Sequence, residues 1–149
     1  EIGGGSGGHL MDGLLIALVV AALVIGGLLM LFIQLTSKQT EKLDRELYRK
    51  VWQAVQRVAD TNNPDSLQMA IIKADKLLDR AMREYGVSGT TMGERLKARR
   101  GLWTNEDAVW SAHKLRNQIA HESRVTITTQ TFKRAMAAFE QALKDLGAL

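Results

Sequence analysis

The chain has 149 residues, enough for one domain of ordinary size, with 46% hydrophobic residues, no cysteine and a formal net charge of +4 at pH 7. The absence of cysteine excludes disulfides, thiolate nucleophiles and cysteine-based zinc sites, and it fits a reducing compartment. The three histidines, His9, His113 and His121, are far apart in the sequence and have few flanking carboxylates. We therefore expect no metal site and no cofactor.

Residues 1–10 contain Gly-Gly-Gly-Ser-Gly-Gly-His, a composition typical of a flexible linker. We expect this segment to lie outside the fold and Met11 to be the natural start; a natural glycine-rich arm is the alternative. From Leu14 to Ile33, twenty consecutive residues carry no charged or polar side chain. At ~1.5 Å per residue they match the ~30 Å bilayer core, so residues 11–35 predict a transmembrane helix. A cleavable signal peptide fits less well, because Asp12 stands where a basic region belongs.

The flanks of this span predict its orientation. No Lys or Arg precedes it, whereas five follow it closely: Lys38, Lys42, Arg45, Arg49 and Lys50. By the positive-inside rule the short N-terminus lies outside an inner or plasma membrane and the C-terminal domain lies in the cytoplasm. Small residues at four-residue spacing in and beside the span favour self-association of the helix, or arise by chance in an alanine-rich span. They are Gly13, Ala17 and Ala21, and Ala22 with Gly26.

Residues 36–149 predict an all-α domain of four principal helices and one short helix, with no convincing strand pair. Apolar residues at three- and four-residue spacing predict that the anchor continues as helix to about Ala59. Asn62-Asn63-Pro64 breaks this helix, because proline suits the first turn of the next one. That next helix carries the strongest amphipathic pattern of the domain and stops at Gly86.

Thr91 and Glu94 predict a capping box that opens a short basic helix. Its cations are candidate contacts for RNA phosphate or anionic lipid; the alternative is a solvated face near the membrane. They are Arg95, Lys97, Arg99 and Arg100.

A further helix is predicted from Thr104 to Ala120, opened by Thr104 with Asp107. Its apolar face also carries His113 and Arg116, and a guanidinium there is costly unless it is paired or meets an anion. The face comprises Val109, Ala112, Ile119 and Ala120. After a polar connection over 123–129, a last helix presents one apolar stripe from Phe132 to Leu146.

Arg116, Asn117 and His121 form the pattern Arg-Asn-x-x-x-His near the end of that penultimate helix. This pattern in an all-helical domain resembles the HEPN superfamily, whose nuclease signature is an Arg, a polar residue, a few further residues and a His. The resemblance covers roughly residues 43–146 by architecture and only these three positions by motif. It implies a metal-independent endoribonuclease that works as a homodimer, with the motif of each subunit lining a shared cleft.

The chemistry of RNA cleavage without a metal explains these residue types. His121 would assist proton transfer, Arg116 would stabilise the charged phosphorane, and Asn117 would position them. On a regular helix Arg116 and His121 are about 140° apart. They converge only if the helix ends near His121 or if a second subunit supplies the partner.

Other interpretations stay open. Arg116 could pair with a buried carboxylate such as Asp75 or Asp79, while His121 caps its helix end. In toxin members controlled by a nucleotidyltransferase, a Tyr stands where this chain has Ser123, so that control is not expected. Two functions follow: a membrane-anchored HEPN-like endoribonuclease in defence or stress control, or a non-catalytic anchored module that dimerises and recruits a cytosolic protein partner.

Overall fold

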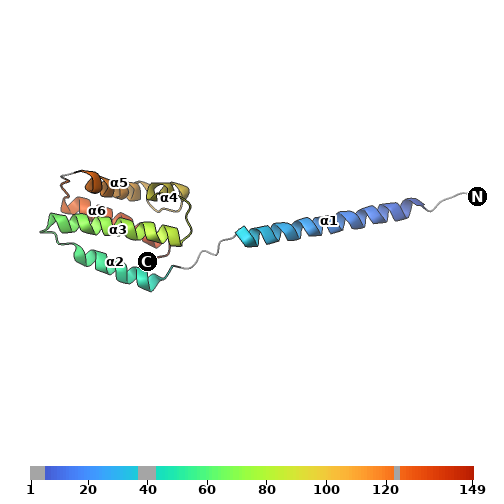
Figure 1. Ribbon diagram of the computed structural model, residues 1–149, viewed down its shortest axis with the longest axis horizontal. Helices are drawn as coiled ribbons and strands as arrows, with labels where there is room; N and C mark the ends of the chain where they lie inside the picture. Colours follow the sequence, from blue (N-terminus) through green and yellow to red (C-terminus); the bar gives the residue numbers. More distant parts are fainter. Residues whose placement is uncertain (1–5, 37–42, 123–124) are drawn as a thin grey trace, which may run out of the picture. The chain divides into compact units, whose positions relative to one another are not determined.

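The computed structural model describes residues 6–36, 43–122 and 125–149, and within them the chain forms six α-helices and no strand (Figure 1). Three residues used in the predictions of orientation and of regulation lie outside the described part, namely Lys38, Lys42 and Ser123. The chain divides into two compact units, residues 1–39 and 40–149. The prediction of an all-helical chain is confirmed for the described part.

Helix α1 (Ser6–Thr36) forms the first unit and contains the predicted apolar run. Residues Asp12–Leu31 have a mean hydropathy of 3.0 and none of this segment is buried, so the helix is long and apolar enough to cross a membrane. A signal sequence has the same properties. The helix includes residues 6–10, which the sequence analysis placed in a linker. Extension of an existing helix is favourable when no proline interrupts it.

Helix α2 (Arg45–Val58) opens the second unit, and its start contradicts the prediction of one continuous helix from the anchor to Ala59. Leu43 and Asp44 are not helical. The Asp44 side chain accepts a hydrogen bond from the backbone N–H of Leu47 at 3.0 Å, as an N-cap does. A new helix therefore begins here because a carboxylate satisfies its free N–H groups.

Helix α3 (Pro64–Glu84) has the predicted bounds. The Asn63 side chain accepts hydrogen bonds from the N–H groups of the first turn, Pro64 occupies the first helical position, and Gly86 follows the helix with φ +85°. Helix α4 (Met92–Ala98) begins with the predicted capping box of Thr91 and Glu94.

Helix α5 (Glu106–His121) differs from its prediction at the start. Its N-cap is Asn105, whose side chain accepts from the N–H of Ala108 at 3.0 Å; the capping box of Thr104 and Asp107 is therefore wrong. Thr104 instead hydrogen-bonds to Asp145 with both its N–H and its hydroxyl group, at 2.8 and 2.7 Å. The N-cap is therefore one residue later than predicted, and Thr104 makes a tertiary contact instead.

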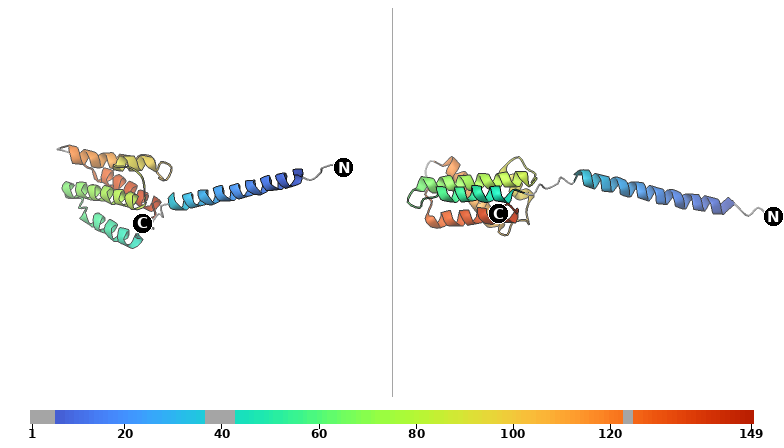
Figure 2. Two further views of the ribbon diagram at one scale, coloured as in Figure 1. Left: turned by 45° about the vertical axis from the view of Figure 1, so that its right-hand side comes forward. Right: turned by 90° about the horizontal axis from the view of Figure 1, so that it is seen from below.

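Helix α6 (Thr129–Asp145) buries most of its predicted stripe, with Phe139 and Leu143 fully inside and Phe132 half-buried. Helix α3 lies at the centre of the unit, because it contacts α2, α4, α5 and α6 (Figures 1 and 2). Helix α2 covers one side of α3, while α4 and α5 lie on the other. This arrangement sets polar residues of α3 against those of α5, where the candidate site lies.

Candidate functional site

A polar hollow of about 760 Å³ lies between α3, α4 and α5. It is lined by acidic, basic and amide side chains from all three helices, including two residues of the Arg-Asn-x-x-x-His pattern. The polar groups that the site depends on are Asp75, Asp79, Arg95, His113, Arg116 and Asn117. We call this hollow the polar cleft.

Asp75 is the buried centre of the cleft. It is 3% exposed, and its Oδ1 lies 2.8 Å from Nδ1 of His113. Its Oδ2 lies 3.3 Å from Nε of Arg116, close enough for an ion pair, although this Nε–H is not aligned for a hydrogen bond. A buried carboxylate is costly unless it is paired, and Asp75 has a partner at each oxygen.

Asn117, on α5, contacts both Arg116 and His113 and so completes this network. Its Oδ1 accepts a hydrogen bond from Nη1 of Arg116 at 3.0 Å, and its Nδ2 lies 3.3 Å from Nε2 of His113. If the amide donates to Nε2, that nitrogen is the acceptor, so the proton of the neutral imidazole is on Nδ1 and faces Asp75. Asp75 and Asn117 thus contact the two ring nitrogens of His113 and set the orientation of its ring.

The network decides between two arrangements that the sequence left open for Arg116. Its carboxylate partner is Asp75, as one alternative proposed, and Asp79 pairs elsewhere. The side chain remains 27% exposed at the cleft. Arg116 is therefore both internally paired and accessible to a ligand.

His121 lies apart from this network. It is the last residue of α5, is exposed, and does not line the polar cleft. No side-chain hydrogen bond of His121 occurs within the described residues, so the expected capping of carbonyl groups is not observed there. The helix ends at His121, as convergence requires, but one copy of the chain does not bring it to Arg116 and Asn117 in the cleft.

Arg95 is a buried cation with internal partners and not a surface cation. It is 6% exposed, and its Nε and Nη2 donate to Oδ1 of Asp79 at 2.9 and 2.7 Å. Its Nη1 donates to the carbonyl of Gly89. These internal bonds occupy the guanidinium, so the structure gives Arg95 the role of joining α4 to α3.

The other three predicted phosphate contacts differ from Arg95 and from one another in exposure and in partners. Lys97 is exposed; Arg99 is half-buried with its guanidinium 4.8 Å from the centroid of the Tyr85 ring; and Nε of Arg100 lies 3.2 Å from a carboxylate oxygen of Glu106. Only Arg95 of the four reaches the polar cleft. The four cations of this run therefore do not line the polar cleft together.

Sequence reasoning missed the cations that line the polar cleft from α3, namely Lys76, Arg80 and Arg83. All three are exposed; Arg80 pairs with Glu84 at 2.7 Å and Arg83 with Asp79 at 3.4 Å. Burial alone would raise the pKa of Glu84, but the hydrogen bonds from Arg80 and Tyr48 outweigh it and lower that pKa. The helical spacing of the three cations in the sequence was the available signal.

Within the described residues, no group of three or more His, Asp or Glu side chains could hold a metal ion. Comparison of the chain with protein-family models, curated proteins and solved structures gave no match. Within the part of the chain that the structure describes, fold and site define a helical bundle with a polar cleft and one helix long and apolar enough to span a membrane.

Proposed function

We propose that the second unit is a HEPN-like four-helix bundle and that two copies of the chain form a metal-independent endoribonuclease at a membrane. One observation carries this proposal. The guanidinium of Arg116 is held by Asp75 and Asn117 at the mouth of the polar cleft, yet it is 27% exposed. A cation fixed in this way is already oriented for an anionic group and need not be ordered when that group binds.

The proposed reaction is cleavage of RNA by its own 2′-hydroxyl group, which displaces the 5′-oxygen from phosphorus. The 2′-hydroxyl attacks phosphorus and loses its proton, the bond to the 5′-oxygen breaks, and that oxygen gains a proton. Arg116 would stabilise the charge that develops on the phosphoryl oxygens. Asn117, whose amide is fixed between Arg116 and His113, would hold this arrangement in place.

His121 would serve in proton transfer, and it belongs to a site built from two copies. Its side chain is exposed at the end of α5, outside the polar cleft of its own copy. An exposed imidazole at a helix end can enter the cleft of a neighbouring chain, and histidine is the side chain that enzymes most often use for proton transfer. In this arrangement a single copy is an incomplete enzyme.

RNA cleavage by the full-length protein in detergent micelles tests the proposal. The wild type should cut a mixture of cellular RNA at neutral pH with a chelator present. His121→Ala should lose about a hundredfold or more of this rate without a change in melting temperature. Gln118→Ala, an exposed neighbour on the same helix, is the control. If pure wild-type protein cuts no RNA under these conditions, the ribonuclease proposal fails.

A second candidate function is a non-catalytic membrane-anchored module that dimerises and recruits a cytosolic partner. The observation that favours it is the internal pairing of Asp75 with both Arg116 and His113, which needs no ligand. On this alternative the polar cleft is structural. Retained dimerisation of a His121→Ala variant, with no ribonuclease activity in the wild type, would select it.

We further propose that α1 is a single-pass anchor with the N-terminus outside and the second unit in the cytoplasm. Its apolar segment has the length of a bilayer span, and the cations of the chain follow it rather than precede it. The same orientation would give the proposed ribonuclease access to cytoplasmic RNA.

A further inference from the structure

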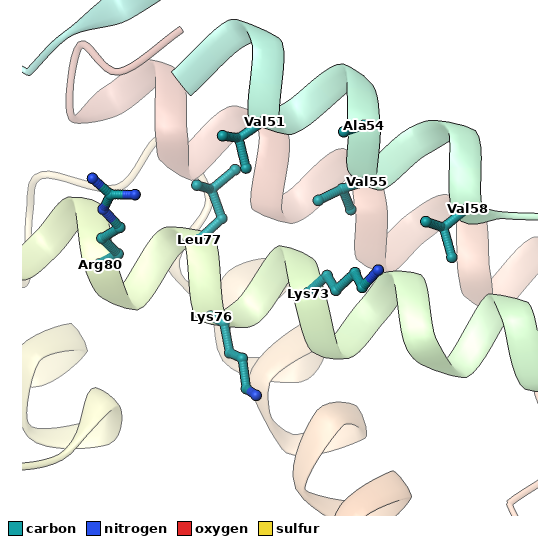
Figure 3. Close-up of a pocket in the computed structure, with 8 residues that line it drawn as sticks. All are labelled: Val51, Ala54, Val55, Val58, Lys73, Lys76, Leu77 and Arg80. Atoms are coloured by element: carbon teal, nitrogen blue, oxygen red, sulfur yellow. The ribbon is translucent and has the colours of Figure 1, made fainter. Parts of the chain in front are cut away.

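A second hollow, of about 430 Å³, lies between α2 and α3. Figure 3 shows that the valine side chains of α2 point toward α3, where Leu77 points back at them. Val55 and Leu77 are buried at its floor, whereas Ala54 is exposed at its edge. The apolar lining residues are Val51, Ala54, Val55, Val58 and Leu77. We call this hollow the α2–α3 groove.

The two walls of the α2–α3 groove have the same helical spacing. Val51, Ala54, Val55 and Val58 on α2 fall at i, i+3, i+4 and i+7, and so do the four residues that α3 contributes. Those four are Lys73, Lys76, Leu77 and Arg80. Each wall therefore offers two helical turns, about 10 Å, which is the form of site that receives an amphipathic helix.

The charged side chains at this groove are all basic. Lys73 and Arg80 flank Leu77 along α3, and Lys76 lies between them in the sequence (Figure 3). Arg80 is held by Glu84 at 2.7 Å and stands over the Tyr48 ring. Lys73 and Lys76 are exposed, and within the described residues neither takes part in an ion pair. An occupant with carboxylates beside its apolar face would complement them.

Other occupants fit these features less well. Two copies of the chain that met through this groove would bring their lysines together, and none of α2 to α6 carries a net negative charge that could serve in trans. RNA would find phosphate contacts but an apolar floor without an aromatic side chain on which bases could stack. Charge and lining together therefore favour a protein helix.

We propose that the α2–α3 groove binds an acidic amphipathic helix of a partner protein. Apolar side chains of that helix would pack on Val51, Val55 and Leu77, and its carboxylates would meet Lys73; the side chain of Lys76 points away from α2 (Figure 3). Lys76 and Arg80 line both the groove and the polar cleft, but the valines, Ala54, Lys73 and Leu77 line the groove and not the cleft, so binding at these residues can be tested separately from ribonuclease activity.

Ala54 offers the sharpest test, because it is exposed in the groove and can be changed to either charge without loss of packing. The probe is a fluorescent helical peptide of about 18 residues with leucines at i, i+3, i+4 and i+7 and glutamates on both flanks. A second peptide carries lysines in place of the glutamates. Binding is measured by fluorescence anisotropy on the full chain in detergent micelles.

The acidic peptide should bind saturably and at least tenfold more tightly than the lysine peptide. Ala54→Glu and Lys73→Glu should each weaken it about tenfold, and Ala54→Lys should strengthen it a few-fold. Lys133→Glu, the same charge change on an exposed residue of α6 outside the groove, should have no effect. Circular dichroism checks that each variant is folded.

Three results would overturn the proposal. One is the absence of saturable binding of the acidic peptide to folded wild-type protein. Another is an equal loss of affinity in Ala54→Glu and Ala54→Lys, since the effect would then be steric. The third is saturable binding of an oligouridine strand that Ala54→Glu abolishes while the peptide does not bind, which would assign the groove to RNA.

Discussion

Nδ1 of His113 lies 2.8 Å from Oδ1 of Asp75, and this contact joins α5 to α3 across 38 residues of sequence. Asp75 also faces Arg116 through its other oxygen, so one buried carboxylate has a cation and an imidazole as partners. The contact gives His113 a partner on the face of α5 that is otherwise buried through apolar residues such as Val109 and Ala112. We therefore expect the stability of the bundle to depend on Asp75.

Asp75→Ala should destabilise the second unit by about 2–4 kcal/mol, because it leaves Arg116 and His113 without their buried partner. The figure lies below that of a fully buried pair, since Arg116 is partly exposed. Urea unfolding in detergent, followed by tryptophan fluorescence, measures the loss. Lys114→Ala, exposed on the same helix, should change the free energy of unfolding by less than about 0.5 kcal/mol. Equal effects of the two substitutions would contradict the role given to Asp75.

The parts of the fold that the sequence predicted correctly are those set by local chemistry. Pro64 and Gly86 bound α3, and Thr91 with Glu94 starts α4, because these signals act within one helical turn. Thr104 was predicted wrongly as part of a capping box. Its hydroxyl and N–H bond to Asp145, which is 41 residues away, and a local pattern cannot show such a partner.

The same difference between local patterns and long-range contacts applies to the candidate site. Spacing alone placed Arg116 on the core face of its helix and suggested a buried carboxylate as partner. The sequence also showed His113 on that face, but not that Asp75 and Asn117 would fix its ring. Arg95 looked like one of several surface cations, because its bonds to Asp79 and Gly89 depend on how α4 packs against α3.

Arg95→Ala should cost about 2–4 kcal/mol of folding free energy, because it removes two hydrogen bonds to Asp79 and one to the carbonyl of Gly89 at a buried position. Lys97→Ala, two residues later on the same short helix and exposed, should be nearly neutral. Thermal unfolding of both variants makes the comparison. A neutral Arg95→Ala variant would show that the guanidinium does not hold α4 in place.

The proposed orientation of α1 as a membrane anchor predicts the behaviour of reporters fused to the C-terminus. In a bacterial cell a C-terminal green fluorescent protein should be fluorescent and a C-terminal alkaline phosphatase inactive, because the cations after the span resist translocation. The reverse pattern would place the second unit outside. Release of a soluble second unit, cut after the apolar segment, would instead identify α1 as a signal sequence.

If the proposed self-association runs through α1, it should depend on the small residues of that helix. Ala17 and Ala21 are four residues apart, and replacing both with leucine should lower the dimer fraction in membranes several-fold, because larger side chains keep two helices apart. Val19→Leu with Val20→Leu, a similar change off this spacing, is the control. Chemical cross-linking at several expression levels measures the dimer. Wild-type protein that stays monomeric throughout would count against the proposed two-copy ribonuclease as well.

Asp145 predicts how stability depends on pH. Its partial burial alone would raise its pKa, but three hydrogen bonds outweigh this effect and lower the pKa below its usual value. They come from the N–H and hydroxyl of Thr104 and from the side chain of Gln141, at 2.8, 2.7 and 2.9 Å. The contacts tie the end of α6 to the start of α5.

Because the pKa of Asp145 is lower in the folded chain than in the unfolded one, its contribution to stability is fully present above the unfolded value near 4. It is lost as the pH falls from there through the folded value. Asp145→Asn should therefore cost about 1 kcal/mol or less at pH 7, where the amide replaces a charged acceptor, because solvent screens this partly exposed carboxylate. The difference from wild type should shrink steadily below pH ~4.

Urea unfolding of both proteins between pH 7 and pH 3 measures this difference, with Asp107→Asn, an exposed carboxylate in the first turn of α5, as the control. A difference that stayed constant over the whole range would mean that the ionised carboxylate adds nothing beyond an uncharged acceptor. A difference that grew on acidification would require a raised pKa, which only a dominant effect of burial over the three hydrogen bonds could produce.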